Sequence, residues 1–156
     1  MLAKGRVLVI ECESLTWPSN FRVPSKRFRL FVAADVARSS IEVLSTFAEA
    51  ALAQGMVYFC AWGPSCERLE EIVDEIVVGD GSDGAGYEGP TRNDVIMTTS
   101  HKTDTLDEAL DFFAEWAIPT EGFAPDSDYW VAVTVGNSSW AASVSKRLQQ
   151  TDSSRS

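Results

Sequence analysis

The sequence predicts an α/β fold: a single-domain three-layer sandwich, with a mainly parallel sheet of about five strands and helices on both faces. Two observations support this prediction. Short apolar runs alternate along the chain with longer segments whose apolar residues recur at helical spacing. Such alternation implies right-handed crossovers between parallel strands. With 156 residues, of which 45% are hydrophobic, the chain is long enough to bury the core of one domain.

Five segments are predicted strands, because they are rich in β-branched and aromatic residues and are bounded by glycine, proline or polar residues. Residues 56–62 (MVYFCAW) are nearly all apolar, which is typical of a parallel strand covered on both faces. The predicted strands are residues 6–11, 28–34, 56–62, 94–99 and 129–135. Residues 12–27, which contain Pro18 and Pro24, and the glycine-rich residues 79–92 are predicted loops.

Four helices are predicted between and after these strands. Ser39 and Glu42 have the spacing of a capping box, as do Thr105 and Glu108, and each pair opens a run of apolar residues at helical spacing. Ser65 is the predicted N-cap of another helix. The predicted helices are residues 39–54, 65–78, 105–117 and 138–149. One domain is therefore expected over residues 1–150, with residues 151–156 as a disordered tail.

The formal net charge of -10 is unevenly distributed along the chain. Between Lys102 and Lys146 there are eight Asp and Glu residues and no Lys or Arg. Such a field repels phosphate backbones and attracts cationic surfaces. A protein partner is therefore expected and nucleic acid is not, although acidic residues that serve only solubility are an alternative.

The sequence predicts a cytoplasmic protein without a cofactor or a bound metal. No apolar run approaches the length of a membrane-spanning helix, so no membrane association is expected. The three cysteines, Cys12, Cys60 and Cys66, are odd in number and have neither C-x-x-C nor zinc-ribbon spacing. This pattern favours free thiols in a reducing compartment.

The candidate site lies at the carboxyl edge of the predicted sheet, because open parallel sheets bind ligands there. The residues expected to line this rim are Trp62, Ser65, Ser100, Asn137 and Ser138. Predicted helices also begin near Ser65, Thr105 and Ser138, and their free amides favour anions, so a nucleotide-type ligand is one alternative. No Gly-x-Gly-x-x-Gly follows the first strand, and the analogy with TIR-type NAD-cleaving domains, prompted by Glu67, concerns the fold alone.

A second alternative is a small hydrolase or transferase. Cys66, in the first turn of a predicted helix, would be the nucleophile, because the helix dipole favours a thiolate. His101, the single histidine, would be its base, with Asp35 or Asp104 orienting the imidazole. The competing interpretation is that Cys66 packs as a small apolar residue of its helix and that His101 only hydrogen-bonds its own loop.

Two resemblances involve these same junctions. Residues 57–67 (VYFCAWGPSCE) resemble the thioredoxin pattern, in which a strand ends in Trp-Cys-Gly-Pro-Cys, but Gly63 stands where the first cysteine would be. Thiol–disulfide exchange needs a second thiol, so this activity is rejected. The segments WGPSCER, DVIMTTSH and LDEALDFF together resemble a family of small uncharacterised bacterial α/β proteins over residues 56–117. That resemblance implies no activity.

Together these observations predict an acidic protein-binding module, such as an inhibitor, an immunity-type partner or an accessory subunit, without catalytic activity of its own. The acidic segment and the missing catalytic motifs support this prediction. Aromatic residues in expected loop or end positions are typical interface anchors. They are Trp17, Phe21, Tyr87, Phe123 and Trp140.

Overall fold

The computed structural model describes residues 2–4, 6–79, 96–123 and 128–155. Its strands are β1 (Leu2–Lys4), β2 (Val7–Cys12), β3 (Phe28–Ala33), β4 (Met56–Trp62), β5 (Met97–Ser100) and β6 (Tyr129–Val135). The five predicted strands correspond to β2 through β6. β1 was not predicted, because three residues are too few to show an alternating pattern. The fourth predicted strand begins at Met97, and residues 94 and 95 lie outside the described residues.

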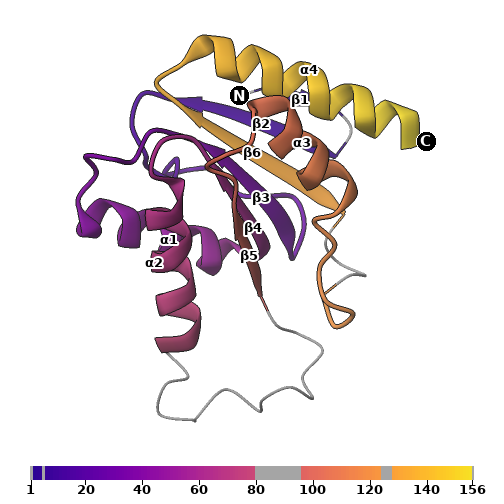
Figure 1. Cartoon of the computed structure of the whole chain (residues 1–156). Coiled ribbons are helices and arrows are strands. Elements are labelled where there is room, and N and C mark those ends of the chain that lie inside the picture. The colour runs from indigo at the N-terminus through magenta and orange to yellow at the C-terminus, as the bar shows by residue number, and fades with distance from the viewer. Residues whose placement is uncertain (1, 5, 80–95, 124–127, 156) are drawn as a thin grey trace.

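The six strands form one sheet in the order β1-β2-β6-β3-β4-β5 (Figure 1). From β2 to β5 every neighbouring pair is parallel, whereas β1 pairs antiparallel with β2. The predicted α/β fold with a mainly parallel sheet is confirmed. β6 lies between β2 and β3, so the last strand in the sequence occupies an inner position of the sheet.

The helices are α1 (Ile41–Gln54), α2 (Cys66–Gly79), α3 (Leu106–Glu115) and α4 (Ser138–Arg155). Ser40, one residue after the predicted cap, is the N-cap of α1, and Thr105 and Glu108 form the predicted capping box of α3. α4 continues to Arg155, beyond its predicted end at residue 149, because no proline or glycine interrupts it. The backbone of residues 151–155, expected to be a disordered tail, is therefore helical.

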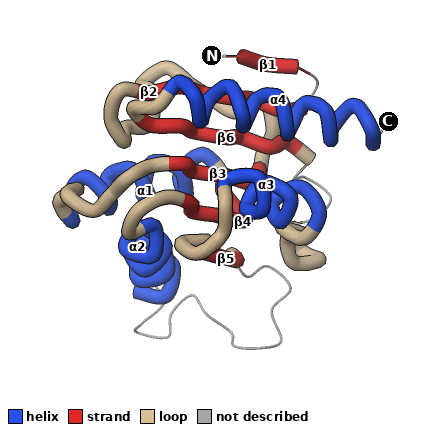
Figure 2. The backbone as a smooth tube through the Cα atoms, turned by 45° about the horizontal axis from the view of Figure 1, so that its top comes forward, coloured by secondary structure: helices blue, strands red, loops and turns tan. Residues whose placement is uncertain are grey.

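Helices cover both faces of the sheet (Figure 2). α1 and α2 pack on one face, together with buried residues of the loop between β2 and β3, such as Trp17. α3 and α4 pack on the other face, where Phe113 contacts the rings of Phe31 and Trp130 at 5.6 and 5.9 Å between centroids. We call these two layers the α1–α2 core and the α3–α4 core.

The connections after β4 and β5 determine where a site can form. α2 follows β4 and joins the α1–α2 core, whereas α3 follows the neighbouring strand β5 and joins the α3–α4 core. The two connections therefore leave the carboxyl ends of adjacent strands toward opposite faces of the sheet. Open α/β sheets bind ligands at such switch points.

Candidate functional site

The corner after β4 is formed by a close approach of two backbones. Gly63 has φ +119°, and a Cβ atom at this position would lie 2.1 Å from the carbonyl oxygen of Ala34. The backbone N–H of Ala34 donates to the carbonyl oxygen of Trp62 at 3.0 Å, and that of Val36 donates to Pro64 at 3.2 Å. The glycine of the WGPSC segment therefore joins the ends of β3 and β4.

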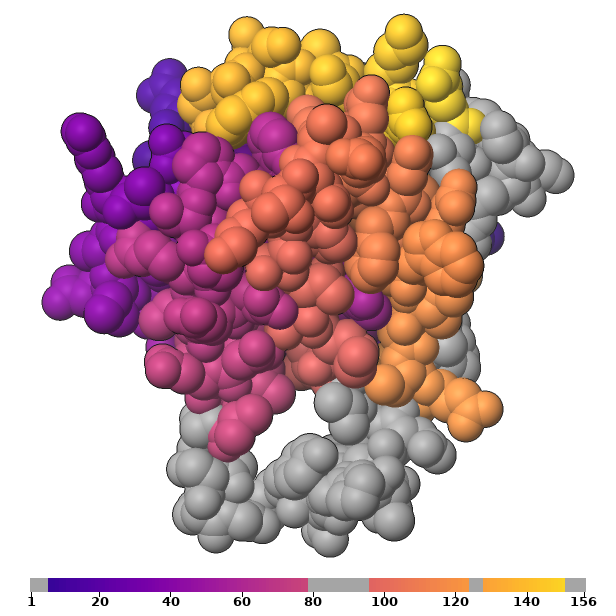
Figure 3. Space-filling view, in the orientation of Figure 1, coloured from indigo at the N-terminus to yellow at the C-terminus, as the bar shows by residue number. Residues whose placement is uncertain are grey.

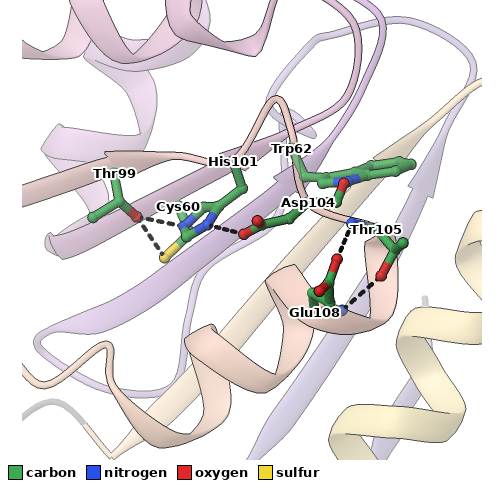
Figure 4. A network of polar contacts seen from close by, with 7 residues as sticks. All are labelled: Cys60, Trp62, Thr99, His101, Asp104, Thr105 and Glu108. Atoms are coloured by element: carbon green, nitrogen blue, oxygen red, sulfur yellow. Dashed lines mark hydrogen bonds and ion pairs between the residues drawn. The ribbon is translucent and has the colours of Figure 1, made fainter.

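His101 is held through its backbone and through both ring nitrogens (Figure 4). Its backbone N–H donates to the carbonyl oxygen of Ala61 at 2.9 Å. Nδ1 lies 2.9 Å from Asp104 Oδ2, and Nε2 lies 2.9 Å from Thr99 Oγ1. The ring also packs on Phe112 of α3, with 4.7 Å between centroids, and His101 is only 9% exposed.

These contacts define the direction of the hydrogen bonds around a neutral imidazole. An ionised carboxylate can only accept, so Nδ1 carries the hydrogen and donates it to Asp104. Nε2 is then an acceptor, and the single hydrogen of the Thr99 hydroxyl can be donated either to it or to Cys60 Sγ, 3.3 Å away. A hydroxyl, an imidazole and a carboxylate are therefore connected in that order, which is an arrangement that can move a proton from the hydroxyl to the ring.

The loop that carries Asp104 is fixed from two sides. Trp62 donates its indole N–H to the backbone oxygen of Asp104 at 2.9 Å, and its ring packs edge-to-face on Trp140 at 5.1 Å between centroids. Immediately after Asp104, the capping box of Thr105 and Glu108 begins α3. Trp62, predicted to line the rim, therefore helps to position the carboxylate that contacts His101.

Two residues near the imidazole, Thr99 and Cys60, were not among the predicted site residues. The hydroxyl of Thr99 lies 3.3 Å from Cys60 Sγ, and the two residues are register partners in β5 and β4. Cys60 is fully buried, and this burial raises the pKa of its thiol to about 12. The alternation of side chains along a strand places Thr99 and His101 on one side, a signal present in the sequence. The pairing with Cys60 depends on the strand register, which the sequence does not give.

Cys66 and the His101 ring belong to different layers. Cys66 is 2% exposed and packs in the α1–α2 core, whereas the ring contacts Phe112 of α3, a residue that packs on the α3–α4 core. Burial raises the pKa of the Cys66 thiol, the backbone N–H of His101 lowers it, and Glu67 raises it further. The structure thus brings His101 and Asp104 together, and it places Thr99 rather than Cys66 on the other ring nitrogen.

Asp35 is part of the turn after β3. Its Oδ1 accepts a hydrogen bond from the backbone N–H of Ala37 at 3.0 Å, and its side chain is exposed. Arg68 of α2 holds the same loop by donating to the carbonyl oxygens of Val36, Ala37 and Ser39. Asp104, not Asp35, is the carboxylate that contacts the imidazole.

The remaining rim residues are placed around helix starts and strand ends. Ser65 precedes α2 with φ +60°, and Ser100 ends β5 half-buried. Asn137 Oδ1 accepts from the backbone N–H of Trp140 at 3.0 Å, so it caps the start of α4. Ser138, at that start, lines a hollow of about 500 Å³ whose other lining residues are Val9, Glu11, Ala141, Ala142, Ser145 and Lys146.

A second hollow, of about 430 Å³, lies between α1 and the loop after β2 and is lined partly by Leu15, Trp17 and Phe47. Neither hollow includes Cys66 or His101 in its lining. Among the described residues, no group of three or more His, Cys, Asp or Glu side chains is arranged to hold a metal ion. Over the same residues, no helix has the length and apolar character needed to cross a membrane.

The fold and the rim together define an α/β protein whose parallel sheet carries helices on both faces and a buried histidine at a switch point. A protein family described as "Domain of unknown function (DUF7684)" matches residues 13–151, so the chain belongs to this family. This membership agrees with the resemblance to an uncharacterised family seen in the WGPSCER, DVIMTTSH and LDEALDFF segments. No curated protein matches the chain.

The relative reactivity of the three cysteine thiols in the folded protein is expected to depend on their exposure. The position of Cys66 at the start of α2 is not expected to make it the most reactive. Burial raises the pKa of all three thiols, but Cys12 is half-buried whereas Cys60 and Cys66 are buried, so iodoacetamide at neutral pH should modify Cys12 first. Peptide mass spectrometry after timed quenching measures the three rates. In urea the three rates should converge. Faster modification of Cys66 than of Cys12 in the folded protein would contradict the placement of Cys66.

Proposed function

We propose that the protein is a binding module for another protein and that the partner docks around the C-terminal end of α3. The observation that supports this proposal is the exposure of two large apolar side chains there: Trp116 is 66% exposed and Ile118 is 63% exposed. Tryptophan is enriched among the residues that dominate binding energy at interfaces. Figure 3 shows that α3 and the segment after it lie at the molecular surface in this view, beside α4.

The charge around this surface favours a basic partner. Glu115 and Glu121 are exposed on either side of Trp116 in the sequence, and the last turn of α3 has no basic residue. The carbonyl end of a helix carries a partial negative charge, which adds to that of the carboxylates. Arg147 of α4 binds Asp111 at 2.7 Å and Asp107 at 3.7 Å, so it offsets only part of the negative charge of α3. Lysine or arginine side chains of the partner would complement the negative charge of Glu115, Glu121 and the carbonyl end of α3.

The aromatic residues expected as anchors have other contacts. Trp17 is buried, Phe21 packs against the α1–α2 core, and Trp140 packs on Trp62. Phe123 lies under the guanidinium of Arg27, 4.8 Å from its ring centroid, and Tyr87 lies outside the described residues. Trp116 was not among the predicted anchors, because it falls inside the predicted helix 105–117, whereas those anchors occupied expected loop or end positions.

An inhibitor, an immunity-type partner or an accessory subunit would each use such a surface. Unpaired cysteines fit a cytoplasmic location for this binding module.

The two alternatives, a nucleotide-type ligand and a hydrolase, have less support. For a nucleotide-type ligand, the start of α3 is less suitable, because the capping box already occupies two backbone N–H groups there, those of Thr105 and Glu108. A hydrolase based on Cys66 and His101 would need a rearrangement of the ring, whose two nitrogens contact Thr99 and Asp104.

The test is differential binding by surface variants. The wild type and a Trp116→Ala, Ile118→Ser double variant are immobilised and exposed to a cell extract of the source organism. A protein retained by the wild type and lost by the double variant is then purified and titrated calorimetrically against both. The double variant is expected to bind at least about tenfold more weakly, because exposed tryptophan anchors often contribute this much. Salt should weaken the wild-type complex, because opposite charges attract across it.

The matched control is Ile41→Ser on α1, because Ile41 is 64% exposed and lies outside the proposed surface. This variant should bind as the wild type does. Equal affinity of the wild type and the double variant would refute the proposal, as would a loss shared with Ile41→Ser or the absence of any protein whose capture depends on Trp116.

A further inference from the structure

A second function can be derived from the hydrogen-bonded side chains at the end of β5. Thr99, His101 and Asp104 do not belong to the proposed docking surface. Thr99 Oγ1 and Asp104 Oδ2 each lie 2.9 Å from a ring nitrogen of His101, one on each side of the ring. Acyl-transfer enzymes place a nucleophilic hydroxyl, a base and an orienting carboxylate in this order. The arrangement is recognised by geometry, so it does not require a particular sequence order.

The surroundings of the three residues suit chemistry at the hydroxyl. They lie where α2 and α3 leave adjacent strands toward opposite faces, and β5 is the outermost strand of the described sheet. Thr99 is half-buried and the Asp104 side chain is 37% exposed, whereas the ring between them is covered by Phe112. The base is therefore shielded from water, whereas the residue that carries the hydroxyl is partly exposed at the sheet edge.

We propose that Thr99, His101 and Asp104 form an acyl-transfer site. Thr99 Oγ attacks the carbonyl carbon of an ester as His101 Nε2 takes the hydroxyl proton, which gives a tetrahedral intermediate. The bond from carbon to the leaving oxygen then breaks, Nε2 returns the proton to that oxygen, and an acyl ester of Thr99 remains. Water then attacks this ester as Nε2 takes one of its protons. The bond from the acyl carbon to Thr99 Oγ breaks, Nε2 returns the proton to Oγ, and the carboxylic acid leaves. Asp104 stabilises the imidazolium formed in each step.

The neighbouring residues restrict the substrate to small uncharged acyl groups. Phe112 presents aromatic surface to the imidazole, and the indole of Trp62 lies beside the backbone of Asp104, which favours apolar groups. Asp104, whose side chain is 37% exposed, and Glu108, exposed in the first turn of α3, would repel a carboxylate or phosphate on the acyl chain. Short-chain esters without a negative charge are therefore the expected class.

The experiment uses p-nitrophenyl acetate and p-nitrophenyl butyrate as probes. Mixing either with the full-length protein should release a burst of nitrophenol, and peptide mass spectrometry should find the acyl group on Thr99. Thr99→Val, which keeps the shape of the side chain, should lose both signals, whereas Thr99→Ser should keep the burst and carry the acyl group at residue 99. Asp104→Asn should slow acylation at least about a hundredfold, because the imidazole loses its orienting carboxylate.

Controls separate this chemistry from unspecific acylation and from unfolding. Thr98→Val removes a hydroxyl that contacts Glu70 and Asp74 instead, so it should leave the burst unchanged. The urea midpoint of each variant shows whether it is folded, and the location of the acyl group in the wild type does not depend on any variant. Acylation of Lys102 or other residues without Thr99, or the absence of a burst above the Thr99→Val rate, overturns the proposal. Neither outcome affects the docking surface, which is tested by binding.

Discussion

Gly63→Ala is expected to destabilise the protein by about 3–5 kcal/mol, because the added methyl group would overlap backbone rather than a movable side chain. The new Cβ would lie 2.1 Å from the carbonyl oxygen of Ala34 and 2.9 Å from its carbonyl carbon. The positive φ of +119° adds strain for any residue with a side chain. Relief would require β3 and β4 to separate where Ala34 donates to Trp62. Urea unfolding followed by tryptophan fluorescence measures the loss.

Gly136→Ala provides the matched control for this prediction. Gly136 also has a positive φ, of +68°, but the nearest atom to its added Cβ would be the Glu13 oxygen at 4.0 Å. Only the conformational penalty applies there, about 1 kcal/mol. Equal shifts of the urea midpoint in the two variants would show that backbone conformation, and not the contact between β3 and β4, determines the cost at Gly63.

A fall in stability above pH 9 is expected from the buried thiol of Cys60. In the unfolded chain this thiol has a pKa near 9.0, whereas burial raises the pKa to about 12 in the folded protein. Between pH 9 and pH 12, unfolding therefore releases a proton from this thiol. The contribution of the thiol to the free energy of unfolding is fully present below pH 9 and decreases as the pH rises toward 12. The contribution lost by pH 10.5 is about 2 kcal/mol. Urea midpoints at pH 8 and 10.5 measure the change.

Cys60→Ala should reduce this pH dependence, although it also removes packing and so lowers stability at pH 8. Tyr58, whose pKa is raised to about 12 mainly by burial, contributes a smaller part that starts near pH 10, and Tyr58→Phe should remove it. The two variants therefore separate the two titrations. An unchanged difference between pH 8 and 10.5 in Cys60→Ala would mean that the thiol does not titrate as its burial requires.

Most of the fold could be predicted from the sequence, because its signals are local. Thr105 and Glu108 show the start of α3 within four residues, and the apolar run of residues 56–62 shows a strand buried on both faces. β1 could not be predicted, because its formation depends on the neighbouring β2 and not on a pattern of its own. The end of α4 was misplaced because a polar sequence without glycine or proline can still continue a helix.

The candidate site could be predicted only in part. Its geometry depends on the register between β4 and β5 and on which face of the sheet each helix covers. The rim position of His101 followed from the strand that precedes it, and Asp104 was close enough in sequence to be considered as its partner. The separation of Cys66 from the ring could not be seen, because it requires knowing that α2 and α3 cover opposite faces. The role of Thr99 required one further step, the alternation of side chains along β5.

The inner position of β6 has a consequence for protein synthesis. β2 and β3 do not pair with each other, and both pair with β6, which consists of residues 129–135. Before residues 129–135 are synthesised, β2 can pair only with β1 and β3 only with β4, so the edge of each strand that faces β6 has no partner. The growing chain must therefore hold two open strand edges until β6 emerges, and this interval is when chaperones would be needed.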